Sequence, residues 1–235
     1  MSEKSLQDLQ KVVERPSKSA SRDKQLQALL RHPRIRTAGY DKSRVSGTES
    51  RYARATTIAT GFAGLDRLLC GGWPRAALTE MLVEHYGCGE MSVLLPALQA
   101  ESAGKGLIVW VCPPYLPYAP ALRAAGIDLS RLVLVNAGND NDALWSAEQA
   151  LKSGACAAVF IWAEATRAHV LRRLQLAAEQ NACWVVIFRP LRFMRQQSVA
   201  ALRIQVSAHG RKLSLRAFKS RFGRPGSVQL SLCDA

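Results

Sequence analysis

The sequence predicts an α/β fold, in which a mainly parallel sheet is flanked by helices and ends in antiparallel strands at its C-terminal edge. Between residues 76 and 188, short and almost fully apolar runs alternate with segments of helical periodicity. Beyond residue 200, apolar and polar residues alternate as in half-buried strands, with hairpin turns between them. Strands that alternate with helices favour right-handed crossovers and a parallel sheet covered on both faces.

The composition indicates two regions. Residues 1–57 are rich in Ser, Lys, Arg and Gln, which predicts a basic N-terminal arm that is partly helical or flexible. Short amphipathic helices are indicated within residues 6–13 and 25–30. Residues 58–235 are predicted to form one core with basic C-terminal strands, and a chain of 235 residues that is 48% hydrophobic suffices for it. The arm would serve regulation or a homo-oligomer; a poorly ordered extension is the alternative.

The stretch from residue 60 to residue 98 organises the core. It predicts a turn, a short helix, a Gly71-Gly72-Trp73-Pro74 turn, a buried strand over Ala76–Val83, a glycine loop and a helix within Met91–Leu98. A buried strand that leads into a glycine loop and then a helix is typical of a phosphate-binding loop. The pattern G-x-x-x-x-G-K-[ST] is nevertheless absent.

The remaining elements follow in order. Buried strands are predicted at residues 107–112, 132–135, 157–162 and 183–188. Helices are predicted at residues 120–125, 142–152 and 166–180, with Asp140 or Asn141 as the cap of the second. Antiparallel strands are predicted at residues 203–205, 212–218 and 228–232, with turns at His209-Gly210 and at residues 223–226.

The residues from Thr60-Gly61 through Gly71-Gly72 to Thr79-Glu80 resemble the beginning of the RecA-type ATPase core. The resemblance implies a RecA-like fold with a degenerate phosphate loop, and the loop residues it points to are Gly87, Gly89, Glu90 and Ser92. Gly89 keeps the second glycine of the loop, whereas Glu84 replaces the first. Glu90 replaces the lysine that neutralises phosphate, and a carboxylate there would repel phosphate instead.

Two further catalytic positions are lost in the same alignment. The general-base glutamate is replaced in the Pro113-Pro114 region, and the aspartate associated with Mg²⁺ corresponds to Trp162. The resemblance therefore implies no catalytic residues, no hydrolysis and no cofactor, with weak nucleotide binding left open. The six cysteines form no C-x-x-C pair, so no metal site is predicted.

Two segments indicate a more specific resemblance within the RecA-like proteins. Residues 71–80 (GGWPRAALTE) and 87–98 (GCGEMSVLLPAL) are similar to the ImuA family of translesion-synthesis accessory proteins and to the smaller SulA relatives. Similarity to the ImuA family implies a non-hydrolysing adaptor in DNA-damage-induced (SOS) mutagenic synthesis. Its implied partners are an inactive Y-family-like polymerase homologue (ImuB), RecA and DNA. A RecA- or RadA-like ATPase and a SulA-type inhibitor of cell division are the alternatives.

The formal net charge of +14 is unevenly distributed. Residues 1–60 carry 13 Lys and Arg against 6 Asp and Glu, residues 61–160 carry 6 against 9, and residues 161–235 carry 13 against 3. A basic surface of this kind favours a polyanion or an acidic protein partner. A solvated strand face that blocks edge-to-edge aggregation is the alternative.

Eight cations of the C-terminal region are the candidates for contact with DNA or a partner: Arg189, Arg192, Arg195, Arg211, Lys212, Lys219, Arg221 and Arg224. In the RecA family, the region after residue 189 includes a DNA-facing loop. Lys219–Gly223 (KSRFG) resembles the K-N-R-F-G motif of RadA-type members. No apolar run approaches the roughly 20 residues of a membrane helix. We therefore expect a cytoplasmic, nucleoid-associated protein without a membrane partner.

Overall fold

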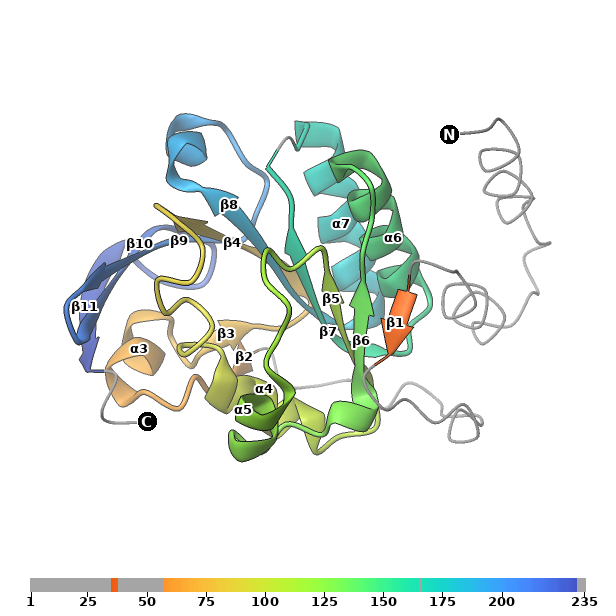
Figure 1. Cartoon of the computed structure of the whole chain (residues 1–235). Helices are drawn as coiled ribbons and strands as arrows, with labels where there is room; N and C mark the ends of the chain where they lie inside the picture. The colour runs from red at the N-terminus through yellow and green to blue at the C-terminus, as the bar shows by residue number, and fades with distance from the viewer. Residues whose placement is uncertain (1–34, 38–56, 165, 232–235) are drawn as a thin grey trace.

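The computed structural model describes residues 35–37, 57–164 and 166–231 (Figure 1). The helices predicted within residues 6–13 and 25–30 lie outside these ranges. One sheet contains nine strands in the order β1-β6-β5-β7-β8-β4-β9-β10-β11. The short strands β2 (Thr57–Ile58) and β3 (Trp73–Pro74) form a separate antiparallel pair.

Six neighbouring strands of the large sheet run parallel. In chain order they are β4 (Ala77–Val83), β5 (Leu107–Val111), β6 (Leu132–Val135), β7 (Cys156–Trp162), β8 (Trp184–Pro190) and β9 (Leu202–His209). Every residue of β4, β5, β6 and β7 is buried. These strands are almost entirely apolar because helices cover both faces of the sheet, and Thr79 and Glu80 of β4 are the polar exceptions.

Antiparallel strands complete both edges of the sheet. β10 (Lys212–Ser220) pairs with β9, and β11 (Gly226–Ser231) pairs with β10, as the sequence predicts. At the other edge β1 (Ile35–Thr37) pairs with β6, although these residues were expected to lie in the arm. The predicted fold class is confirmed: the parallel core and the antiparallel C-terminal strands form a RecA-like α/β sheet.

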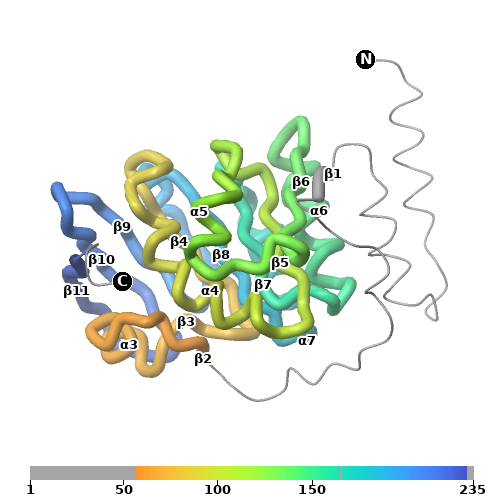
Figure 2. The backbone as a smooth tube through the Cα atoms, turned by 60° about the horizontal axis from the view of Figure 1, so that its bottom comes forward, coloured from red at the N-terminus to blue at the C-terminus, as the bar shows by residue number. Residues whose placement is uncertain are grey.

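Helices cover the sheet in two layers (Figures 1 and 2). One face carries α6 (Asp140–Lys152) and α7 (Ala168–Asn181), and we call it the α6/α7 face. The other, the α4 face, carries α3 (Ala63–Leu68), α4 (Leu95–Ser102) and α5 (Ala119–Ala124). Two short 3₁₀ helices, η2 (Leu129–Arg131) and η3 (Leu191–Arg195), precede β6 and follow β8.

The starts of α6 and α4 differ from the predicted ones for local reasons. The cap of α6 is Asn139 rather than Asp140 or Asn141, because its side chain accepts a hydrogen bond of 3.0 Å from the Asp142 amide. Helix α4 begins at Leu95, after a hydrogen-bonded turn that takes up the first residues of the apolar run from Met91. The glycine loop is thereby separated from the helix that follows it.

Aromatic side chains fill the core beneath the α4 face. Each ring contacts at least one other, with centroids 4.5 to 6.4 Å apart. The residues are Trp73, Trp184, Phe160, Trp110, Trp162 and Phe188. Large rings in such edge and stacked contacts contribute both buried area and specific packing. Strands β5, β7 and β8 are therefore joined across one face by side chains as well as by backbone.

Candidate functional site

The glycine loop follows β4 at the carboxyl end of the parallel strands, where ligands bind in many open α/β sheets. Its later residues are tied into tight turns. The Ser92 amide donates to the Gly89 carbonyl at 3.0 Å, and the Leu95 amide donates to the Met91 carbonyl at 3.0 Å. In a phosphate-binding loop, backbone N–H groups face the phosphate. In this glycine loop, some of them instead donate hydrogen bonds to carbonyl groups of the loop itself.

Glu90 turns its carboxylate into the loop. Its side chain is almost fully buried, and Oε1 accepts a hydrogen bond of 2.8 Å from the Gly87 amide. Among the described residues, Oε2 is buried without a hydrogen-bond partner. Burial and the negative charge of Glu90 raise the pKa of the neighbouring Cys88 thiol to about 11. The loop thus holds an anion of its own beside its glycines.

Gly89 marks the place where the loop packs on the sheet extension. It has φ +100, and a Cβ there would lie 3.0 Å from Leu213 Cδ2 of β10. The backbone and the neighbouring side chain both favour glycine at this position. Of the predicted loop residues, the structure brings Gly87, Gly89 and Glu90 together, and Ser92 follows half-buried at the next turn.

The loop between residues 84 and 92 contains no lysine or arginine. At the carboxyl end of β7, Trp162 stacks on Phe188 with ring centroids 4.5 Å apart. It belongs to the same core cluster as Val93 and Leu94, which follow the loop. Pro113 and Pro114 follow the end of β5, as predicted. The loop therefore offers no Lys or Arg side chain for phosphate, and Trp162, Pro113 and Pro114 offer no side-chain oxygen for Mg²⁺.

In the described part of the chain, no group of three or more His, Cys, Asp or Glu side chains could hold a metal ion. Glu164, two residues after Trp162, interacts with residues outside the glycine loop. Its carboxylate pairs with the Arg192 guanidinium, and its amide donates to Asp140 Oδ2 at 3.1 Å. Within the same described ranges, no helix is long and apolar enough to cross a membrane.

The position of Arg189 contradicts the prediction that this residue contacts DNA or a protein partner. Arg189 is 0% exposed and lies inside the protein, so DNA or a protein partner cannot reach it. Its Nη1 donates to Glu80 Oε1 at 2.7 Å, and its Nη2 donates to Gln196 Oε1 at 2.7 Å. The guanidinium also lies 4.4 Å from the Phe193 ring centroid. Arg189 is a structural cation that holds η3 against the sheet.

Sequence reasoning missed Glu80 and Arg203, which complete this buried cluster. Arg203 Nε donates to Glu80 Oε2 at 2.7 Å, and its Nη groups donate to the carbonyls of Phe193 and Met194 at 3.1 Å. The sequence feature that could have indicated this cluster is a single glutamate inside the apolar strand of residues 77–83. A buried carboxylate needs charged partners, and arginines in neighbouring strands can supply them.

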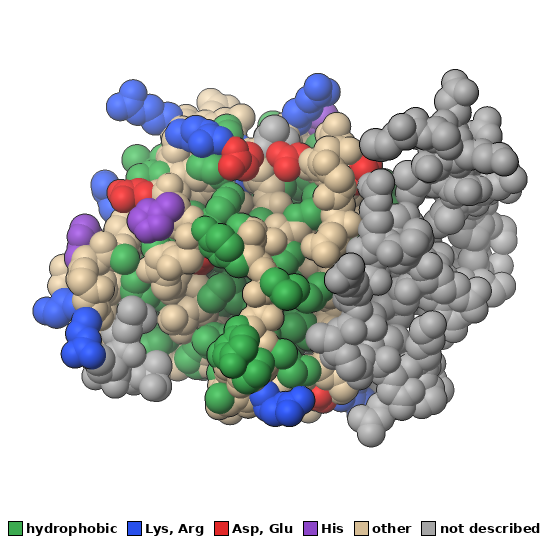
Figure 3. Space-filling view, in the orientation of Figure 1, with side chains coloured by type: hydrophobic (Ala, Val, Ile, Leu, Met, Phe, Trp, Pro, Cys, Tyr) green, Lys and Arg blue, Asp and Glu red, His purple; other side chains and the backbone are tan. Residues whose placement is uncertain are grey.

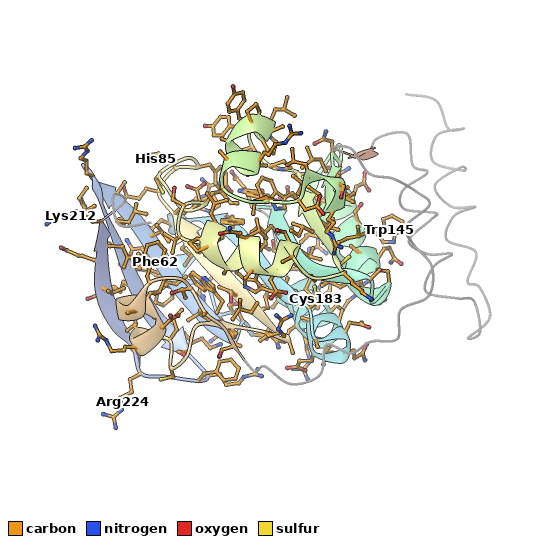
Figure 4. The ribbon with its side chains drawn as sticks, turned by 90° about the horizontal axis from the view of Figure 1, so that it is seen from below. Phe62, His85, Trp145, Cys183, Lys212 and Arg224 are labelled. Carbon is orange, nitrogen blue, oxygen red and sulfur yellow. The ribbon has the colours of Figure 1, made fainter. Side chains whose placement is uncertain are left out.

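The other seven predicted cations are exposed but do not form one cluster. Arg192 and Arg195 lie on η3. Arg211 and Lys212 lie at the turn that follows β9, at the carboxyl end of the parallel strands. Lys219, Arg221 and Arg224 lie at the opposite end of β10, roughly 25 Å away at the usual rise per residue. In Figure 4, Lys212 and Arg224 point outward from opposite ends of the sheet extension.

An exposed apolar ridge follows β5. Tyr115, Leu116 and Tyr118 are 67%, 83% and 72% exposed, and they lie between prolines in the loop that leads into α5. Figure 3 shows hydrophobic side chains gathered on this side of the molecule. Contiguous exposed apolar side chains are typical of protein interaction sites.

No family model matches this chain, and no curated protein matches it in sequence.

Proposed function

We propose that this chain is a non-hydrolysing RecA-like accessory protein of SOS, DNA-damage-induced translesion synthesis. It would act as an adaptor to an inactive Y-family-like polymerase homologue, to RecA and to DNA, in the cytoplasm at the nucleoid. The observation that carries the proposal is the Glu90 carboxylate inside the glycine loop, bonded to the Gly87 amide. A loop that contains its own anion and no cation is poorly suited to bind triphosphate.

Two surface features support an adaptor. The ridge of Tyr115, Leu116 and Tyr118 offers large amphipathic and apolar anchors, which dominate the energetics of protein interfaces. The exposed cations on η3 and the C-terminal strands offer a separate surface for a polyanion. One partner can therefore bind the ridge while another binds the basic surface.

Calorimetric titration of the full chain with ATP and Mg²⁺ tests the absence of a nucleotide site, beside an intact RecA-type ATPase as control. We expect no binding heat for this chain and a clear isotherm for the control. Mg²⁺-dependent ATP turnover that is lost in Gly87→Ala and Gly89→Ala variants would instead establish the ATPase alternative.

A capture experiment tests the adaptor role. The polymerase homologue, immobilised, should retain the full chain, and the Tyr115→Ala/Tyr118→Ala variant should be retained at least roughly tenfold less, as for loss of interface anchors. Arg67→Ala on α3 is a surface control that should bind normally. Overexpression that causes filamentous cells, in a strain with an unchanged repair phenotype, would point to the SulA-type function instead.

A further inference from the structure

The α6/α7 face of the sheet is covered only in part. Helices α6 and α7 pack on β4, β5 and β7, while β9, β10 and β11 extend beyond them (Figure 1). On the opposite face, the same three strands bury Val206, Leu215 and Leu230 in the core. The residues that alternate with these apolar side chains therefore project from the uncovered face.

The strand register aligns these projecting residues in three rows of three. The rows are His209–Lys212–Ser231, Ser207–Ser214–Gln229 and Gln205–Arg216–Ser227, and we call the nine residues the polar grid. None of the nine is buried. Gln205 Nε2 donates to Ser207 Oγ at 3.2 Å, so neighbouring members already interact along the strand. The grid presents hydroxyl, amide and cationic donors side by side.

The segment of the chain that forms the grid carries charges of one sign. From residue 180 to residue 233 the sequence contains 10 Lys and Arg and no Asp or Glu. Lys219, at the end of β10 next to the grid, has a pKa lowered by partial burial and by the positive charges of Arg203 and Arg221. Ordinary solvated surfaces mix charges of both signs. A sheet face with cations and no carboxylate is complementary to a polyanion.

We propose that the polar grid is the surface on which duplex DNA lies, held through its phosphate backbone and without regard to base sequence. Lys212 and Arg216 would neutralise phosphates, and the serine and glutamine side chains would donate hydrogen bonds to phosphate oxygens. Along β10 the grid runs from Lys212 to Arg216, which corresponds to about 14 Å or roughly four base pairs of duplex. Lys219, which lies opposite Arg203 in the register and donates to the Ser198 carbonyl at 2.6 Å, flanks the same face.

The grid itself fits a duplex better than a single strand. Single-strand sites usually stack bases on exposed aromatic side chains. None of the nine grid residues is aromatic apart from the imidazole of His209. The nearest large ring on β10, Phe218, is half-buried, with the Arg203 guanidinium 4.9 Å from its centroid. Phosphate contacts without stacking or base-edge contacts confer affinity without sequence preference.

This inference rests on the DNA contact in the proposed function, and a salt series tests the two separately. Binding of the full chain to a fluorescein-labelled duplex is followed by anisotropy between about 50 and 200 mM salt. Arg216→Gln should weaken binding roughly tenfold and reduce the slope of log K against log salt by about 0.9. Arg216→Lys should keep the slope. Arg123→Gln on α5, with the same charge change on the α4 face, should match wild type.

The uncharged members of the grid provide a sharper test. The Gln205→Ala/Gln229→Ala variant should lose about two- to tenfold in affinity with an unchanged salt slope, because it removes donors and no charge. The substituted grid residues are on the solvent side of the strands, and circular dichroism of each variant checks the fold. An unchanged affinity in either Arg216→Gln or the double glutamine variant would overturn the grid as the DNA surface.

The remaining outcomes are also decisive. If wild type binds no duplex even at the lowest salt, both the grid and the proposed contact with DNA fail. If it binds duplex but Arg216→Gln behaves like Arg123→Gln, only the grid fails. Tighter binding to polyglutamate than to duplex would assign the face to an acidic protein, and tighter binding to a single strand of the same length would exclude the duplex geometry.

Discussion

Glu80 and Arg189 form an ion pair across the neighbouring strands β4 and β8, and both side chains are 0% exposed. Arg189 Nη1 donates to Glu80 Oε1 at 2.7 Å, while Arg203 of β9 occupies the other carboxylate oxygen. Both arginines also hold residues of η3 or the segment after it. One carboxylate therefore connects three strands to the loop that carries Arg192 and Arg195.

Glu80→Ala should destabilise the protein strongly, because it leaves two buried guanidinium groups without their counter-ion. We expect the free energy of unfolding to fall by about 3 to 5 kcal/mol in a denaturant titration. Glu164→Ala is the matched control, since it breaks the exposed pair with Arg192 and should cost at most about 1 kcal/mol. Equal losses in the two variants would contradict the role given to the buried cluster.

Tyr86, in the glycine loop, should ionise at a higher pH than an ordinary tyrosine. Partial burial, together with the negative charges of Glu164 and Asp140, raises its pKa from about 10 to about 12. Between about pH 10 and 12 the unfolded chain loses the Tyr86 proton while the folded chain keeps it, so this residue lowers stability as the pH rises through that window. Below about pH 10 it has no effect. The tyrosinate absorbance should lose its latest component in Tyr86→Phe, and an unchanged titration would contradict the assignment.

The cysteine thiols should differ widely in reactivity. Cys70 is exposed, whereas Cys156 and Cys183 are buried. Burial raises the pKa of Cys156 to about 12 and also raises that of Cys183, so neither supplies thiolate at neutral pH. Site-resolved alkylation of the native protein should modify Cys70 well before Cys156 and Cys183, which should react only on unfolding. Comparable rates for Cys70 and Cys156 would show that the sheet opens more readily than its packing implies.

Gly72→Ala should disrupt the β2–β3 pair. Gly72 has φ +121, and a Cβ there would lie 2.0 Å from the Ile58 carbonyl oxygen. We expect the free energy of unfolding to fall by at least about 3 kcal/mol, because backbone strain and overpacking act together. Gly210→Ala provides the control, because Gly210 also has positive φ, at +61, but a Cβ would meet no atom within 4 Å. That variant should lose only about 1 kcal/mol in thermal or denaturant unfolding.

Strands β4 to β8 of the parallel core were predictable because they are short and mostly apolar runs between polar or turn-forming residues. Strand β9 was predicted over residues 203–205 among the antiparallel strands, but it runs parallel to β4 and antiparallel only to β10. The predicted strand at residues 132–135 matches β6, and that at residues 107–112 overshoots β5 by one residue. Strand β1 was not predicted, because three residues within a polar, basic stretch carry no periodic signal. Its place in the sheet depends on pairing with β6, about a hundred residues later in the chain.

The candidate site was predictable only where the chemistry is local. Glu90 stands three residues after Gly87, so a spacing argument could find the altered loop, although not the direction of its carboxylate. Arg189 was assigned to the surface because its neighbours are basic. Its partner Glu80 lies 109 residues earlier, and only the adjacency of β4 and β8 brings the two together. The polar grid likewise depends on the register of three strands.

The aromatic rings beneath the α4 face also determine which part of the molecule tryptophan fluorescence reports. Four of the five tryptophans, Trp73, Trp110, Trp162 and Trp184, belong to it, while no tryptophan occurs in residues 202–231. Indole emission therefore reports the parallel core, whereas far-ultraviolet dichroism includes the antiparallel extension. A mismatch between the two melting curves would reveal that the C-terminal strands detach before the core unfolds.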